Sequence, residues 1–261
     1  MRIQGAIAMI KDALNKNMDN STLDYQNHLT FDIDWAPDIS INEIRKIINS
    51  AGIKATFFIT HKSDILKDLI EDGHELGIHP NFLVGSSQGD TPEKAIEFLL
   101  NIVPEARALR THALVQSSPL LQLIFSKFPQ LKYDFSILMY NFPFIGKFNW
   151  QFEGTQFKRL NYNWEDDAAF YHEGFKWNCL YFPGKLNIYD FHPIHVHLNS
   201  KDITPYNALK KSLTIPLSDI GAKHLTEFIN PDYGAHTFLK VMTQSNVNFI
   251  DFEGLLCASE L

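Results

Sequence analysis

The chain has 261 residues, of which 45% are hydrophobic and 20% are charged, and its formal net charge is -7. This length allows one large core, and the composition is that of a globular protein rather than a disordered or fibrous one. The acidic balance, without a basic stripe interleaved with aromatic residues, argues against a nucleic-acid partner. Cys179 and Cys257 stand far apart and outside any CxxC motif, so we expect buried, reduced thiols rather than a disulfide or a thiolate metal site.

Residues 1–27 are expected to form a helical extension ahead of the main domain. The opening stretch, MRIQGAIAMIKDALNK, is apolar only in short runs, and Lys11 and Asp12 interrupt it before a signal peptide is complete. No run in the chain approaches the length of a transmembrane segment. We therefore expect an amphipathic helix, no transmembrane segment and a cytoplasmic protein.

Strand and helix patterns alternate from His28 onward, which predicts one α/β barrel domain over residues 28–261. Short connections between the elements favour parallel strands joined by right-handed crossovers. Residues 139–173, rich in Asn, Phe, Pro and Trp, are predicted to be loops over one end of the barrel. The strands are expected at 28–34, 53–60, 74–79, 106–112, 131–138, 185–199 and 247–252, and the helices at 40–52, 63–73, 91–103, 118–129 and 235–246.

Polar residues stand at the ends of four predicted strands. In a parallel barrel these ends meet at one rim, where active sites form. Each residue taken alone could be a helix cap or a surface ion-pair partner. Together, carboxylates and neutral imidazoles with an open position describe a catalytic divalent metal site. The residues are Asp32, Asp34, His79, Arg110, His112, His192 and His195.

The motifs LTFDID, AGIKATFFIT and GHELGIHPN resemble, in order and spacing, the opening of the polysaccharide deacetylases with the NodB homology domain, carbohydrate esterase family 4. These enzymes are distorted, often seven-stranded (β/α) barrels that hydrolyse N-acetyl groups on amino sugars. The resemblance implies a distorted parallel (β/α) barrel of seven strands here. It also implies that Asp32 is the general base and that Asp34 and His79 bind a divalent metal, with zinc as the expected ion.

The resemblance continues through ALRTHAL, LKYDFSI, RLNYNWEDD and DFHPIH, and so covers about residues 28–255. It implies that Arg110 orients the base, that an acidic residue, Asp166 or Asp167, supports catalysis, and that His192 is the general acid. It is similar above all to the subgroup associated with surface-polysaccharide and O-antigen synthesis. We further expect three substrate-contacting residues, namely His195, Asn81 and Trp164.

One position departs from the family pattern. Most members read H-x-x-x-H in the second motif and bind the metal through both histidines, whereas Leu83 stands at the second position here. Leucine cannot ligate, so the chain either has a substitute third ligand, holds the metal weakly or has lost it. His112 is the leading candidate because it ends the adjacent strand; Asn81, His195 and water are the alternatives.

Amide hydrolysis needs an activated water, stabilisation of charge on oxygen and a proton for the leaving nitrogen. The candidate residues could supply these, which favours a metal-dependent deacetylase whose substrate is an N-acetylated sugar or glycan. The alternative prompted by Leu83 is a catalytically inert barrel that binds a carbohydrate or a partner enzyme. A third reading is a hydrolase of another ester or amide on the same barrel.

Overall fold

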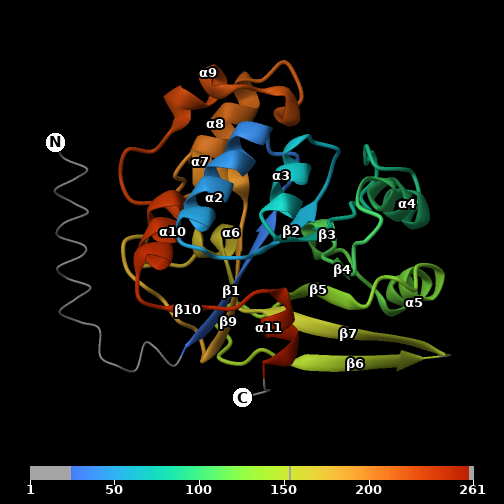
Figure 1. Ribbon diagram of the computed structural model, residues 1–261. Helices are drawn as coiled ribbons and strands as arrows, with labels where there is room; N and C mark the ends of the chain where they lie inside the picture. Colours follow the sequence, from blue (N-terminus) through green and yellow to red (C-terminus); the bar gives the residue numbers. More distant parts are fainter. Residues whose placement is uncertain (1–24, 153, 259–261) are drawn as a thin grey trace.

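The computed structural model describes residues 25–152 and 154–258 of the chain (Figure 1). Most of the expected helical extension, residues 1–24, therefore lies outside the described residues. Its last residues, Gln26 and Asn27, belong to the first strand, β1 (Gln26–Asp32). Within the described ranges no helix is long and apolar enough to cross a membrane.

The centre of the fold is a ten-stranded sheet. Nine of its strands follow the order β6-β7-β5-β4-β3-β2-β1-β9-β8, and the tenth, β10, pairs with β1. Every ladder is parallel except that between β6 and β7. The sheet is thus parallel-dominated, as predicted, but the expected number of seven strands is wrong. The strands after β1 are β2 (Thr56–Ile59), β3 (Glu75–Ile78), β4 (Ala108–Leu109), β5 (Tyr133–Leu138), β6 (Lys147–Phe152), β7 (Thr155–Tyr162), β8 (Trp164–Glu165), β9 (Leu186–Phe191) and β10 (Asn248–Phe249).

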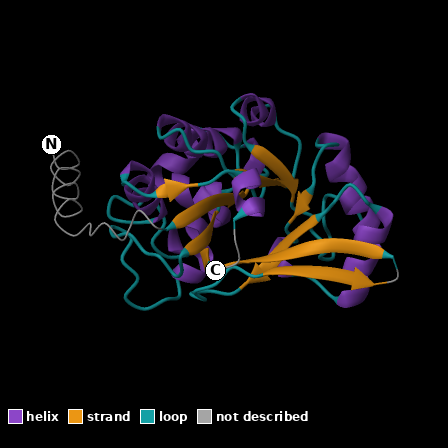
Figure 2. Ribbon diagram, turned by 60° about the horizontal axis from the view of Figure 1, so that its bottom comes forward, coloured by secondary structure: helices purple, strands orange, loops and turns teal. Residues whose placement is uncertain are grey.

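The additional strands come from residues 139–173, which the sequence predicted to be loops. β6 and β7 form an antiparallel hairpin in which Trp150 pairs with Phe157 (Figure 2). Aromatic cross-strand pairs of this kind stabilise hairpins. The polar residues between the aromatic ones therefore reflect strand alternation rather than a lack of regular structure.

The sheet curls so far that one continuous segment lies at both of its ends. β7 pairs with β5, whereas β8 pairs with β9. A single residue, Asn163, separates β7 from β8. Asn163 joins the two edges, because its backbone N–H donates to the carbonyl of Ile188 in β9. The curled sheet encloses an interior that side chains from most strands share.

Helices cover the outside of the curled sheet. α2, α7 and α10 pack together on one side, and α4 and α5 on another (Figure 1). α2 buries an apolar stripe against the sheet, since Ile41, Ile44 and Ile48 are fully buried. The α-helices are α2 (Asp38–Ser50), α3 (Ile65–Glu71), α4 (Pro92–Ile102), α5 (Ser118–Lys127), α6 (Asp166–Ala169), α7 (Pro193–His197), α8 (Thr204–Ser212), α9 (Ala222–Leu225), α10 (Ala235–Gln244) and α11 (Phe252–Cys257), with 3-10 turns η2 (His112–Leu114), η3 (Leu217–Asp219) and η4 (Thr226–Phe228).

Two local expectations are corrected. The predicted strand over 185–199 ends at Phe191, because Pro193 starts α7, and proline suits the first turn of a helix. The two cysteines are free thiols as expected, but Cys179 and Cys257 are exposed rather than buried.

The interior of the curled sheet is polar. Arg110 is fully buried there, and its side chain contacts groups from five strands, in β1, β2, β5, β7 and β9. Thr30, Thr56 and Asp190 are also completely buried. Because buried charges must be paired, this interior fixes the positions of the polar side chains at the rim.

Candidate active site

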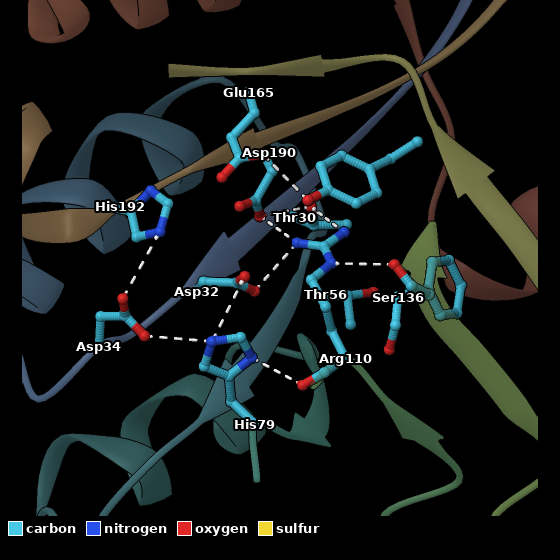
Figure 3. Close-up of polar contacts among 12 residues, drawn as sticks. Thr30, Asp32, Asp34, Thr56, His79, Arg110, Ser136, Glu165, Asp190 and His192 are labelled. Atoms are coloured by element: carbon cyan, nitrogen blue, oxygen red, sulfur yellow. Dashed lines mark hydrogen bonds and ion pairs between the residues drawn. The ribbon is translucent and has the colours of Figure 1, made fainter. Parts of the chain in front are cut away.

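Most of the predicted site residues converge at the carboxyl ends of β1, β3, β4 and β9, and Figure 3 shows Asp32, Asp34, His79, Arg110 and His192 among them. Asp34 follows β1 by two residues, His79 follows β3 directly, and His192 follows β9 directly. His112 opens the η2 turn after β4. Parallel strands bring these ends together, so Asp34 and His192, 158 positions apart in the sequence, share one rim.

Asp34, His79 and His112 form the first cluster. The Oδ1 atom of Asp34 lies 3.1 Å from Nε2 of His79 and 3.1 Å from Nδ1 of His112. The two ring nitrogens are 3.3 Å apart. One oxygen and two nitrogens therefore face a common point.

The tautomer of His79 follows from its other ring nitrogen. Nδ1 lies 2.7 Å from the carbonyl oxygen of Arg110, which can only accept, so Nδ1 carries the hydrogen. In the neutral ring the lone pair is then on Nε2, directed at Asp34 and His112. A lone pair facing a carboxylate requires a cation between them, either a proton or a metal ion.

The donor set fits a divalent metal. One carboxylate and two imidazoles, with the non-ligating nitrogen of one imidazole held by a backbone carbonyl, is a usual catalytic arrangement. Without a metal, the proton takes its place: burial would lower the pKa of His79, but Asp32 and Asp34 outweigh it and raise that pKa. Burial would likewise raise the pKa of Asp34, but hydrogen bonds to His112 and His79 hold it well below its usual value.

Asp32 lies beside this cluster and is held by Arg110. Nη1 of Arg110 donates to Oδ1 of Asp32 at 2.9 Å, and Oδ2 of Asp32 is 3.6 Å from Nε2 of His79. The guanidinium is stacked between the rings of Phe58 and Tyr162, with its central carbon 4.6 and 4.1 Å from their centroids. This arrangement fixes the carboxylate of Asp32 and leaves Oδ2 directed at the rim.

Asp190 is a second partner of Arg110 that the sequence analysis missed. Its Oδ1 accepts from Nη1 of Arg110 and, at 2.8 Å, from the hydroxyl of Thr30, whereas its Oδ2 is buried without a hydrogen-bond partner among the described residues. Burial, reinforced by Asp32 and opposed by Arg110, raises the pKa of Asp190 well above its usual value. The signal was present in the sequence, since Asp190 is the one charged residue in the apolar strand β9 and shares a face with His192.

Glu165 is another missed residue. It ends β8 in register with Asp190, so both side chains face the interior. One of its oxygens accepts from the hydroxyl of Tyr162 at 3.0 Å. Burial, with smaller contributions from Asp167 and Asp32 and opposition from His192, raises the pKa of Glu165 to about 7.

His192 is oriented by Asp166 rather than by Asp167. Nδ1 of His192 lies 2.8 Å from Oδ1 of Asp166, and its backbone N–H donates to Oδ2 of the same residue at 2.9 Å. Nε2 is left facing the metal-type cluster, 3.7 Å from Oδ2 of Asp34. Burial alone would lower the pKa of His192, but Asp167, Asp166 and Asp34 outweigh it and raise that pKa well above its usual value.

Similarity to known proteins decides the family of the chain. The sequence matches the WbmS-like polysaccharide deacetylases over residues 29–210. The chain belongs to this family. The expectation of a NodB-type polysaccharide deacetylase is therefore confirmed.

A WbmS-like relative of known structure has the same architecture. The chain is similar to a Bordetella bronchiseptica crystal structure described as a candidate polysaccharide deacetylase involved in O-antigen biosynthesis, with 29% identity and a TM-score of 0.70. The similarity covers 89% of this chain and 95% of that one. It supports the same curled α/β fold in both proteins.

More distant similarities lie outside the WbmS-like group. A family 4 acetyl xylan esterase from Clostridium thermocellum, solved with a cobalt ion, shares 13% identity over 64% of this chain and 74% of its own, with a TM-score of 0.38. The Bc1960 peptidoglycan N-acetylglucosamine deacetylase shares 14% identity over 90% and 89%, with a TM-score of 0.45. At these values neither carries an argument about function. No curated protein matches the chain.

Not all the expected substrate contacts of this WbmS-like chain fit the structure. His195 does lie at the site, with Nε2 2.9 Å from Oδ1 of Asp167. Trp164 does not fit, because it is completely buried among aromatic rings that include Phe191 and Phe238. Strand alternation explains this correction: Glu165 faces inward, so Trp164 must face the helices.

Asn81 and Leu83 lie in the loop that follows His79. Oδ1 of Asn81 accepts from the backbone N–H of Leu83 at 2.9 Å, so it is occupied within its own loop. Leu83 itself is 47% exposed. Leu83 offers no donor atom, whereas the η2 turn places Nδ1 of His112 3.3 Å from Nε2 of His79.

Proposed function

We propose that the chain is a metal-dependent hydrolase that removes an N-acetyl group from an amino sugar during synthesis of a bacterial surface polysaccharide of the O-antigen type. The observation that carries the proposal is the convergence of Asp34, His79 and His112 between an Arg110-held Asp32 on one side and an Asp166-held His192 on the other. The family and the description of the Bordetella relative support the class of reaction and the biosynthetic setting.

Asp34, His79 and His112 would hold the metal, and zinc is the ion we propose because two imidazoles and a carboxylate suit it. A bound divalent cation supplies Lewis acidity that polarises the amide carbonyl and makes water more acidic. Asp32 would accept the proton of the attacking water at Oδ2, while Arg110 keeps the carboxylate in place. Nε2 of His192 would donate a proton to the departing nitrogen, with Asp166 holding the ring.

The test is acetate release from a panel of N-acetylated amino sugars, free and as glycans, with metal content measured in the same preparation. We expect release that a chelator abolishes and a divalent metal restores. A protein that binds no metal and releases no acetate from any sugar would contradict the proposal and favour an inert barrel. Acetate release that continues unchanged in the chelator would contradict the metal dependence but not the deacetylation.

Asp166→Asn should shift the pH profile. A general acid acts only while protonated, so activity falls as pH rises through its pKa. Asp166 is one of the carboxylates that raise the pKa of His192, and its loss should move the alkaline limb of kcat/KM to lower pH. Glu93→Gln, which removes a partly exposed partner of Lys127, is the control and should leave the limb in place. A lower kcat with an unmoved limb would mean that Asp166 does not tune the acid.

A further inference from the structure

We infer that Trp35 is a substrate-positioning residue whose indole ring packs against the pyranose ring that carries the acetamido group. The inference deepens the proposed function and rests on it. Trp35 would contact the sugar ring, whereas Asp32 and His192 would act at the acetamido group.

Trp35 lies directly beside the candidate metal cluster. It follows Asp34 in the sequence, and its ring meets that of His112 at 88° with 5.3 Å between centroids. A ligand held at Asp34 and His112 therefore has the indole as a neighbour.

The ring has no structural role in the core. The chain contains four tryptophans, and the other three either belong to the main hydrophobic cluster or pack against it. Trp35 does neither, remains partly exposed, and its indole N–H has no hydrogen-bond partner among the described residues. A large amphipathic side chain with one free donor is suited to a ring that presents both C–H groups and hydroxyls.

The backbone at this position is also unfavourable for tryptophan. Asp34 and Trp35 have φ values of 45° and 55°, in the left-handed region that favours glycine. The backbone N–H of Trp35 donates to the hydroxyl of Thr60 at 2.9 Å, which holds the turn. Such conformations cost free energy and concentrate at functional sites, so a bulky residue here calls for a functional reason.

The experiment compares Trp35→Ala and Trp35→Phe with the original chain on the sugar that is deacetylated best. In Trp35→Ala we expect KM to rise about ten-fold and kcat to stay within about two-fold, because a contact to the sugar is lost but the reacting groups are not moved. Trp35→Phe should recover part of the affinity. The inhibition constant of acetohydroxamate, which has an acetyl group and no sugar ring, should be unchanged in both variants.

Binding and stability give readouts that do not depend on turnover. In metal-depleted protein, the same sugar should change the tryptophan fluorescence, and Trp35→Phe should abolish the change. Trp35→Gly should unfold at the same temperature as the original chain or a higher one, because glycine adopts the left-handed backbone conformation without the steric strain of a larger side chain. Phe98→Ala, which removes an exposed ring on α4, is the control and should leave KM unchanged.

The outcomes separate this inference from the proposed function. An unchanged KM in Trp35→Ala, with an active original chain, would overturn the inference and leave the function standing. Parallel losses of sugar affinity and acetohydroxamate affinity would also overturn it, since Trp35 would then support His112. If no N-acetylated sugar is deacetylated by the original chain, the proposed function fails and the inference falls with it.

Discussion

Asp32→Asn should reduce deacetylation by about a hundred- to ten-thousand-fold while leaving the metal content unchanged. The amide keeps the shape of the carboxylate, and its oxygen can still accept from Arg110. It cannot accept the proton of the attacking water, so the chemical step is lost and metal binding is not. Acetate release and metal analysis on the same sample check both halves of this result.

The control for Asp32→Asn is Asp68→Asn, which changes a half-exposed carboxylate paired with Arg45. It should leave activity unchanged, because exposed ion pairs contribute little. If Asp32→Asn loses its metal along with its activity, Asp32 is a ligand rather than the base, a possibility that the 3.6 Å distance from His79 makes worth measuring.

His112→Ala should weaken metal binding on the order of ten-fold or more. Two protein ligands rarely hold a catalytic divalent ion, and His112 would supply the third donor that Leu83 cannot. Its Nδ1 atom already lies 3.1 Å from Asp34 and 3.3 Å from His79. Competition with a chromogenic chelator measures the affinity directly.

Two matched variants distinguish His112 from the alternatives in the neighbouring loop. Leu83→Ala and Asn81→Ala should both keep the original metal affinity, because Leu83 is exposed and the Asn81 oxygen is already bonded within its loop. If Asn81→Ala weakens binding and His112→Ala does not, the third ligand comes from the loop after His79.

From the sequence, the polar residues at the strand ends could be predicted better than the shape of the sheet could. Asp34, His79 and His112 could be grouped because parallel strands deliver their ends to one rim, whatever the strand number. The hairpin of β6 and β7 was missed because its aromatic and amide-rich composition resembled that of a loop. His74, just before β3, is buried and bonded to Ala55 and Asn49, and so serves the structure rather than the site.

The missed residues share one physical cause. Glu165 and Asp190 matter because they face the same interior as Arg110, and which way a strand residue faces depends on register. Because β8 was not predicted, nothing in the sequence distinguished the inward-facing Glu165 from the neighbouring Asp166 and Asp167. For the same reason Trp164 was expected at the substrate site, although it faces the helices. Only the folded chain shows that Arg110 is shared between Asp32 and Asp190.

One divalent metal bound at this rim should serve the hydrolysis. Anomalous diffraction at the zinc edge, from crystals of the metal-loaded protein, would locate it. We expect a single peak about 2.0–2.2 Å from a carboxylate oxygen of Asp34 and from ring nitrogens of His79 and His112. A metal-loaded crystal with no peak at these three side chains, or with its peak bonded elsewhere, would show that Asp34, His79 and His112 do not form the metal site.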